Sequence, residues 1–295
     1  MIGLMIYAET TRLDHEANKQ YVRNIALLRT ICLLAVLSMG STSLSSAHEY
    51  YLMPESFTPN DGVEFSVRHR LGQKFKGNEL PFINRWNIRS ETWKDGEKKS
   101  VRGQDGDRPA LKVTGRGKGL MSVVHQSNVD FLTFKTWEKF KAYVTKEGLA
   151  HALQPSLQGT KPKVDLIEGY ARYAKTLIAL GGDVSGTDRP TGLKIELVAL
   201  AHPLALNAAE PMPVQLLYEG EALEGARIKV FVGIGTEFAY QIESDREGKA
   251  LIPARGPGPY LLNAIHMTEP QGKEAKDKKA HWESFWASLT FQRGN

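Results

Sequence analysis

The sequence predicts a mainly β protein of two β-sandwich domains, immunoglobulin-like or transthyretin-like, with a helical insertion in the first domain. Three observations lead to this prediction. Apolar and polar residues alternate in many short segments, as in "VEFSVRH" at 63–69. Turn sequences such as "NDG" at 60–62 and "KDGEK" at 94–98 separate these segments. The apolar period changes to that of a helix only between about residues 131 and 181.

The amino-terminal segment is typical of an export signal. Residues 25–39 are mostly apolar, but they are too few for a membrane span and include an arginine. Ser45 and Ala47 then occupy the small-residue positions of a signal-peptidase site. We therefore expect residues 1–47 to be removed. The mature protein would be periplasmic, without stable membrane insertion, and would begin at His48.

Composition narrows the classes of function. The only cysteine, Cys32, lies in the predicted signal, so the mature protein has no thiol ligand and no disulfide. The signal is long, and a start at Val22, read from a GTG codon, would leave residues 1–21 outside the true protein. The formal net charge is +5 over 295 residues, and basic and acidic residues are interspersed along the sequence. This pattern excludes nucleic acid as a partner.

Residues 48–203 form the first predicted domain. Besides 63–69, its strands are expected in "NRWNIRSETW" at 84–93 and "GLMSVVHQS" at 119–127, because both are rich in β-branched and aromatic residues. A further strand is expected at 192–200, "GLKIELVAL".

Two helices are predicted in the insertion at about 131–181. Apolar residues recur at helical spacing from 133 to 148, and a glycine ends this segment. A second set of apolar and aromatic residues forms one stripe from 164 to 180, again followed by glycine. On this second helix we expect Arg172 and Lys175 to be exposed, as part of a solvated helix face or, as the alternative, as cations that dock a partner.

Residues 204–295 form the second predicted domain. Strand signals at 211–232, 256–267 and 283–291 are separated by turns that contain Gly, Asp and Pro. Short strands at this spacing predict an immunoglobulin-like sandwich.

Catalytic motifs are missing from the sequence. It has no G-x-S-x-G elbow, no H-E-x-x-H, no P-loop and no Rossmann fingerprint. With no cysteine left after cleavage, a cysteine nucleophile is excluded as well. The sequence therefore predicts a binding protein, not an enzyme.

Histidines carry the chemical signal that remains. After cleavage His48 would have a free amine beside its imidazole, and these two nitrogens can bind one metal ion together. His69, His125 and His266 each end a row of inward-facing strand residues, at the rim of a predicted sandwich. We predict a metal site in which His125 or His266 completes the chelate of His48, with His69 as a further candidate ligand.

Several longer stretches have a pattern known from other proteins. They include "AHEYYLMPESFTPNDG", "FLTFKTWEKFKAYVTKEGLAHAL", "GYARYAKTLI" and "HWESFWASLTF". Over nearly the whole of residues 48–295 the sequence resembles a broad family of exported bacterial proteins of formally unknown function, often associated with periplasmic nickel or cobalt uptake. The resemblance implies an Ala-His cleavage junction and a mainly β fold. It also implies nickel or cobalt as cargo for a membrane uptake transporter or an outer-membrane receptor.

Other hypotheses stay open. Copper(II) is a chemical rival, because affinity at nitrogen-rich sites favours it over nickel and cobalt. A metal-free structural or adhesive module that binds protein or glycan fits the same β pattern. A third hypothesis is an enzyme in which copper bound at the N-terminal histidine oxidises a polymer. It would require measurable turnover on such a polymer. Replacing His48, or adding one residue before it, should abolish binding by an N-terminal metal site and leave an adhesive module unchanged.

Overall fold

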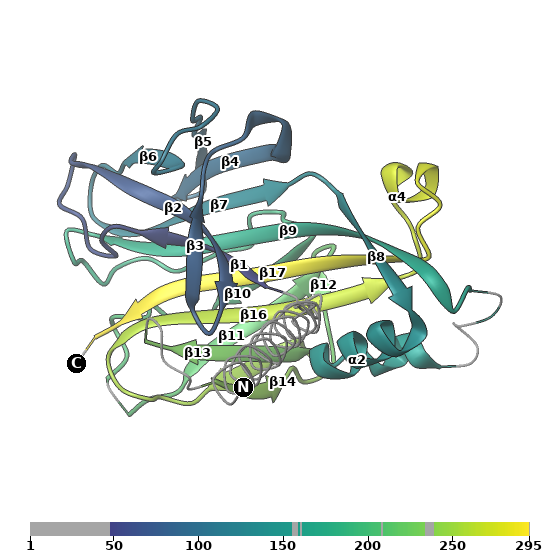
Figure 1. The fold of residues 1–295 in the computed structure, drawn as a ribbon. Helices are drawn as coiled ribbons and strands as arrows, with labels where there is room; N and C mark the ends of the chain where they lie inside the picture. The colour runs from purple at the N-terminus through teal and green to yellow at the C-terminus, as the bar shows by residue number, and fades with distance from the viewer. Residues whose placement is uncertain (1–47, 155–158, 160, 208, 234–238, 295) are drawn as a thin grey trace, which may run out of the picture. The chain divides into compact units, whose positions relative to one another are not determined.

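The structure is a computed structural model that describes residues 48–154, 159, 161–207, 209–233 and 239–294. The predicted signal peptide therefore lies outside the described residues. Strands dominate the described ranges (Figure 1), so the prediction of a mainly β protein is confirmed. None of the helices in these ranges is long and apolar enough to cross a membrane.

The largest sheet has nine strands drawn from both halves of the sequence. They are β4 (Asn87–Lys94), β5 (Glu97–Ser100), β7 (Gly119–Ser127), β8 (Asp130–Thr136), β9 (Val164–Leu180), β13 (Arg227–Val232), β14 (Ala239–Glu243), β16 (Gly258–Thr268) and β17 (Trp282–Arg293). Their order is β14-β13-β16-β17-β9-β7-β4-β5, and β8 pairs with the part of β9 that β7 leaves unpaired.

Two smaller sheets and a few short helices complete the fold. The first small sheet contains β1 (Glu49–Pro54), β2 (Glu64–Gln73), β3 (Lys76–Leu80) and β6 (Leu111–Thr114). The second small sheet contains β10 (Ile195–Ala199), β11 (Met212–Tyr218), β12 (Glu221–Ala222) and β15 (Lys249–Ile252). The helices are α2 (Trp137–Glu147) and α4 (Lys273–Asp277), with 3-10 turns at Asn84–Trp86 and Ala150–Leu153.

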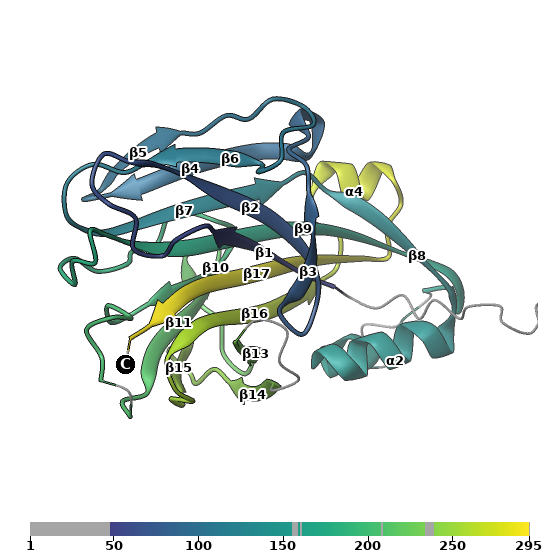
Figure 2. The ribbon, with the colours of Figure 1, turned by 60° about the vertical axis from the view of Figure 1, so that its left-hand side comes forward.

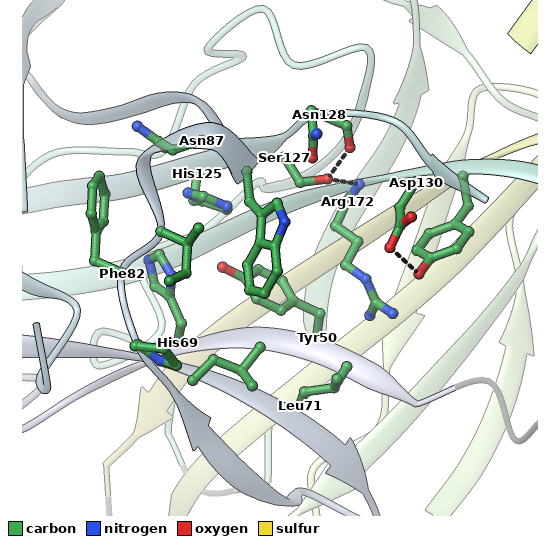
Figure 3. Close-up of a pocket in the computed structure, with 15 residues that line it drawn as sticks. Tyr50, His69, Leu71, Phe82, Asn87, His125, Ser127, Asn128, Asp130 and Arg172 are labelled. Carbon is green, nitrogen blue, oxygen red and sulfur yellow. Dashed lines mark hydrogen bonds between the residues drawn. The ribbon is translucent and has the colours of Figure 1, made fainter. Parts of the chain in front are cut away.

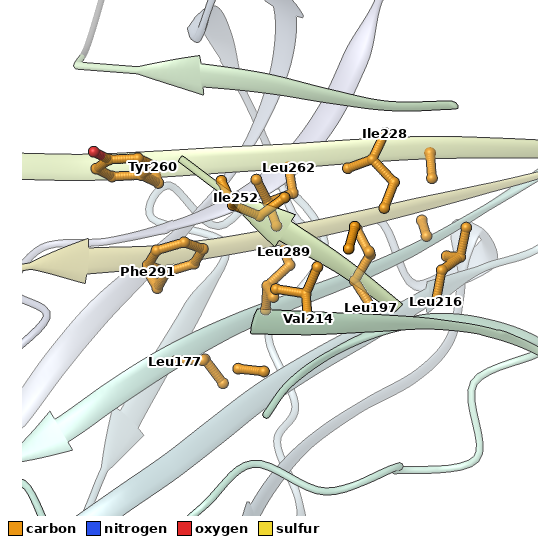
Figure 4. Packing of buried hydrophobic residues seen from close by; sticks show 14 of the residues in the cluster. Leu177, Leu197, Val214, Leu216, Ile228, Ile252, Tyr260, Leu262, Leu289 and Phe291 are labelled. Carbon is orange, nitrogen blue, oxygen red and sulfur yellow. The ribbon is translucent and has the colours of Figure 1, made fainter. Parts of the chain in front are cut away.

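The two small sheets cover opposite faces of the nine-stranded sheet (Figure 2). Successive side chains of a strand point to opposite faces. On β9, Ala174 and Ile178 pack with residues of the first small sheet, whereas Tyr173 and Leu177 pack with residues of the second. Figure 4 shows Leu177 in the core between the nine-stranded sheet and the second small sheet. Leu197 of β10 belongs to the same core. The strand β9 is therefore buried on both faces.

Helix α2 closes one end of the face that carries the first small sheet. Its Phe140 and Val144 are fully buried and pack with Trp282, Trp286 and Ile265 of the nine-stranded sheet. The aromatic rings of Phe140 and Trp282 stack at 6.1 Å.

One of the two predicted helices is confirmed and the other is wrong. Helix α2 follows Thr136, whose hydroxyl accepts from the Lys139 amide at 3.4 Å, and it ends at Gly148, which has φ 80°. The segment 164–180 is not a helix but the strand β9. Because β9 is covered on both faces, it is apolar on both, and its apolar residues match a helical period by coincidence. Consequently Lys175, predicted to be exposed, is buried at 1% exposure.

Strand pairing continues across residue 203, the predicted boundary between domains. Strand β17 lies between β16 and β9, and it pairs in parallel with β9 from Trp282 opposite Glu168 to Thr290 opposite Thr176. Contacts group the described residues into one compact unit, whereas the sequence predicts two domains. Alternating patterns identify the strands but do not reveal which strand each one pairs with.

Candidate functional site

A cavity of about 220 Å³ lies between the first small sheet and the nine-stranded sheet. Its lining comes from β1, β2 and β3 on one side and from β7, β8 and β9 on the other. Figure 3 shows the imidazoles of His69 and His125 at one end of the cavity and Arg172 at the other. Trp86, which is 45% exposed, also lines it.

His69 and His125 come from different sheets and meet in this cavity. On β2 the side chain of His69 points to the same face as that of Val67, and on β7 the side chain of His125 points to the same face as that of Val123. Both valines belong to the core shared by these two sheets. Their ring centroids are 4.5 Å apart, and both side chains are buried, at 5% and 4% exposure. The ring of Tyr50 lies beside both, at 5.7 Å from His69 and 5.5 Å from His125.

Both imidazoles are neutral at pH 7. Burial lowers the pKa of His69 to about 4. Burial, together with the neighbouring His69, lowers the pKa of His125 well below its ordinary value. A neutral imidazole keeps one nitrogen lone pair, which can accept a proton from a ligand or bind a metal ion.

Hydrogen bonds determine which nitrogen of His125 keeps the lone pair. The Ser90 hydroxyl donates to Asn87 Oδ1 at 2.8 Å and lies 3.0 Å from His125 Nδ1. Because the hydroxyl has one proton, its oxygen accepts from Nδ1–H, and the lone pair stays on Nε2. Two further polar atoms, His69 Nε2 and Tyr50 Oη, are buried without a hydrogen-bond partner. Such atoms indicate a place for a ligand.

Arg172 supplies a positive charge to the cavity. Its guanidinium lies 5.7 Å from the ring of Tyr50, 5.3 Å from that of Tyr170 and 5.6 Å from that of Trp286. Its Nη1 donates to the carbonyl oxygen of His48 at 3.0 Å. Among the described residues no carboxylate forms an ion pair with it.

His48 lies away from the histidine pair. It is exposed at the start of β1, beside Leu71, which also lines the cavity. In the pairing of β1 with β2, Leu52 is opposite His69. At ~3.3 Å per residue, the rise from His48 to Leu52 is about 13 Å. The structure does not bring the backbone nitrogen of residue 48 to the pair.

His266 lies on the other face of the nine-stranded sheet. It is opposite Phe285, which belongs to the core shared with the second small sheet. His125 follows Val123, which belongs to the core shared with the first small sheet. The ring neighbour of His266 is Tyr218, at 4.5 Å, and burial lowers the pKa of His266 to about 4.

Of the four sequence-predicted ligands, the structure brings His69 and His125 together and separates His48 and His266 from them. In the described ranges no group of three or more His, Cys, Asp or Glu side chains could hold a metal ion. Tyr50 and Arg172 also line the cavity, and neither was among the sequence-predicted site residues. Tyr50 could have been found because it is two residues after His48 and therefore points to the same face of the strand. Arg172 could not, because the segment 164–180 was predicted to be a helix.

A family model described as "Domain of unknown function (DUF4198)" matches residues 45–268. No curated protein matches the chain. One solved structure, "Crystal structure of tetra-tandem repeat in extending region of large adhesion protein", is similar with a TM-score of 0.22 and 8% identity, over 84% of this chain and 49% of that chain. This chain thus spans about half of that structure's length. The "D0-D1 domain of Intimin" is similar with a TM-score of 0.21 and 9% identity, over 82% of this chain and 97% of the other. The FN1-FN3 domains of chicken CNTN1 give a TM-score of 0.18 and 7% identity, over 74% and 57%.

Proposed function

The chain belongs to the family described as "Domain of unknown function (DUF4198)", and from this premise we propose that it is a periplasmic protein that binds a divalent transition metal at His69 and His125. One observation carries the proposal. Two buried imidazoles, both neutral, line one cavity with their centroids 4.5 Å apart, and His69 Nε2 has no partner.

The donor set suits borderline metals. Neutral imidazole binds nickel, cobalt, copper and zinc. Nickel or cobalt comes first because of the family resemblance, and copper(II) is the rival because the affinity order favours it. The protein would deliver the ion to a membrane uptake transporter or an outer-membrane receptor and would catalyse no reaction.

Two nitrogens do not fill the coordination sphere of such an ion, which takes four or more ligands. Burial raises the pKa of the Tyr50 phenol, so this group stays protonated and acts as a hydrogen-bond donor. The cavity, at about 220 Å³, has room for several waters, each with a share of ~30 Å³, or for a small co-ligand. Arg172, in the wall of the same cavity, suits a carboxylate on that co-ligand. We therefore expect the ion to bind as a complex with a small carboxylate chelator.

Calorimetric titration tests the proposal. Ni(II), Co(II), Cu(II) and Zn(II), each alone and each with an equimolar carboxylate chelator such as citrate, would be titrated into protein that begins at His48. The variants are His69→Ala and His125→Ala, with His266→Ala as the control, because it removes a half-buried histidine from the opposite face. A protein with one residue added before His48 tests the amine.

The proposal requires binding that is lost in His69→Ala and in His125→Ala but kept in His266→Ala and in the extended protein. Binding that is lost only on extension would assign the ion to the amine of residue 48 instead. No binding in any protein would leave the metal-free adhesive module as the better hypothesis.

A further inference from the structure

Lys175 is a charged side chain buried in the centre of the fold. It lies on β9, on the face that packs against the second small sheet, and its side chain is 1% exposed. Its Nζ is 3.2 Å from Asp188 Oδ1 and 3.0 Å from Asp188 Oδ2. The carboxylate of Glu196 on β10 lies 2.5 Å from the same nitrogen. Asp188 and Glu196 have side-chain exposures of 0% and 2%.

Both carboxyl groups are held in place by other donors. Asp188 Oδ1 accepts from the Ser122 hydroxyl at 3.0 Å, and Oδ2 accepts from the Ala199 amide at 3.0 Å. Glu196 accepts from the amide and the hydroxyl of Thr191, each at 2.9 Å. Because Nζ is nearly equidistant from both oxygens of Asp188, the carboxyl carbon between them lies in the ~3–3.5 Å range in which reacting atoms are poised.

We propose that Lys175 and Asp188 condense to form an intramolecular isopeptide bond, with Glu196 as the proton carrier. Glu196 accepts a proton from the ammonium, and the nitrogen lone pair attacks the carboxyl carbon of Asp188. The N–C bond forms, and one oxygen of Asp188 departs as water with two of the three ammonium protons. The amide nitrogen keeps the third proton, and Glu196 ends in its starting state. The step needs no oxidant, reductant or other co-reactant.

The surroundings favour the covalent product. Three charged groups are buried together, and condensation removes one positive and one negative charge from an environment that penalises both. The Ser122 and Ala199 donors stabilise the negative charge that develops on Asp188 during attack. Burial alone would lower the pKa of Lys175, but Asp188 and Glu196 raise it above its ordinary value. Lys175 is therefore an ammonium before the reaction, and its nitrogen becomes a nucleophile only when Glu196 has taken a proton.

The bond would join the nine-stranded sheet to the segment that leads into the second small sheet. The chain has a single cysteine, so it has no intrachain disulfide, and this amide would be a covalent cross-link within the fold. A second buried lysine offers an internal comparison. Lys229 pairs with Glu147 and Glu49, but its side chain is 11% exposed, and Glu147 Oε1 and Glu49 Oε2 lack donors. We expect Lys229 to remain an ordinary ion pair.

Tryptic mapping of the denatured protein tests the proposal directly. Trypsin does not cleave at an acylated lysine, and Arg189 is followed by Pro190, which also blocks cleavage. The cross-linked protein should therefore yield residues 173–194 as one peptide, lighter than its sequence mass by one water. An unmodified protein yields residues 173–175 separately from 176–194, and this result would overturn the proposal.

Variants test the roles of the groups. Lys175→Arg and Glu196→Gln should both give peptides of unreduced mass, and Asp188→Asn should lose ammonia instead of water if the reaction still proceeds. Cleavage after Lys229 should be normal in every protein. A water loss found in the 176–194 peptide alone would indicate a cyclised aspartate and contradict the cross-link. A cross-link that persists in Glu196→Gln would exclude Glu196 as the proton carrier.

Discussion

His69 and His125 face each other with their ring centroids 4.5 Å apart, although one belongs to the first small sheet and the other to the nine-stranded sheet. An ion held by both would connect the two sheets across their shared core. Metal binding and the stability of this interface are therefore linked, since a ligand that binds only the folded state stabilises it.

Nickel should raise the melting temperature of the wild type. At a free concentration 100 times the Kd, binding adds about 2.7 kcal/mol, which corresponds to a rise of about 5–11 °C in melting temperature for a protein of this size. His125→Ala should lose the increment, because one of the two nitrogens is gone. His266→Ala should keep it. Thermal unfolding followed by circular dichroism, with and without NiCl2, measures the melting temperature of each protein. Equal rises in His125→Ala and His266→Ala would contradict the assignment of the ion to His69 and His125.

The stability of the apo-protein should fall in mild acid. Burial lowers the folded-state pKa of His69 to about 4, so between pH 6.5 and 4 the unfolded chain binds more protons than the folded one. The contribution of neutral His69 to the free energy of unfolding is thus complete above pH 6.5. It is lost as the pH falls towards 4, and the loss is on the order of 3 kcal/mol. Urea unfolding of wild type and His69→Leu across this range should show a weaker pH dependence in the variant. His48→Ala, at an exposed site, should follow the wild type.

Glu168 should have the opposite pH dependence. Burial raises its pKa to about 7, even though the hydroxyls of Ser284 and Tyr143 donate to it and lower it. Its contribution is complete below about pH 4.5 and is lost as the pH rises through 7. The free energy of unfolding of Glu168→Gln, relative to that of the wild type, should therefore increase by up to about 3 kcal/mol between pH 4.5 and 8. Glu138→Gln, on the exposed side of α2, serves as the control in the same unfolding series; a parallel gain there would refute the prediction.

Truncation of the core between the nine-stranded sheet and the second small sheet should be costly. Leu177 is 2% exposed and lies in this core (Figure 4). Leu177→Ala should reduce the free energy of unfolding by about 2–5 kcal/mol, because it leaves a cavity that neighbours fill only in part. Leu251, which is 59% exposed, should tolerate the same change with little loss. Chemical denaturation compares the two, and similar losses would show that the layers pack differently.

Much of the fold and part of the site follow from local patterns. The alternation that ends at His69 and the one that ends at His125 both identify inward-facing side chains, and both are correct, because strand geometry fixes the direction of every second residue. The same reasoning places His266 on an inward face, but alternation cannot tell which of two faces that is. Only the pairing of distant strands separates His266 from His125.

The segment 164–180 shows why the rest could not be predicted. A strand covered by sheets on both faces loses the polar half of its alternation, and a run of apolar residues matches a helix as well as a strand. The error has a chemical consequence. A helix would expose Lys175, whereas the strand buries it beside Asp188 and Glu196.

The position of β17 has a consequence for the order in which the protein can become compact. This strand is the last along the chain in the nine-stranded sheet, yet it lies in the interior of that sheet, between β16 and β9. Until residues 282–293 are available, the strands on either side have no hydrogen-bonding partner at these edges, and the sheet remains in two parts. Closing it requires contacts between segments that are far apart in sequence, which makes folding slow. A chain with this connectivity can therefore complete its largest sheet only after its last strand has been synthesised.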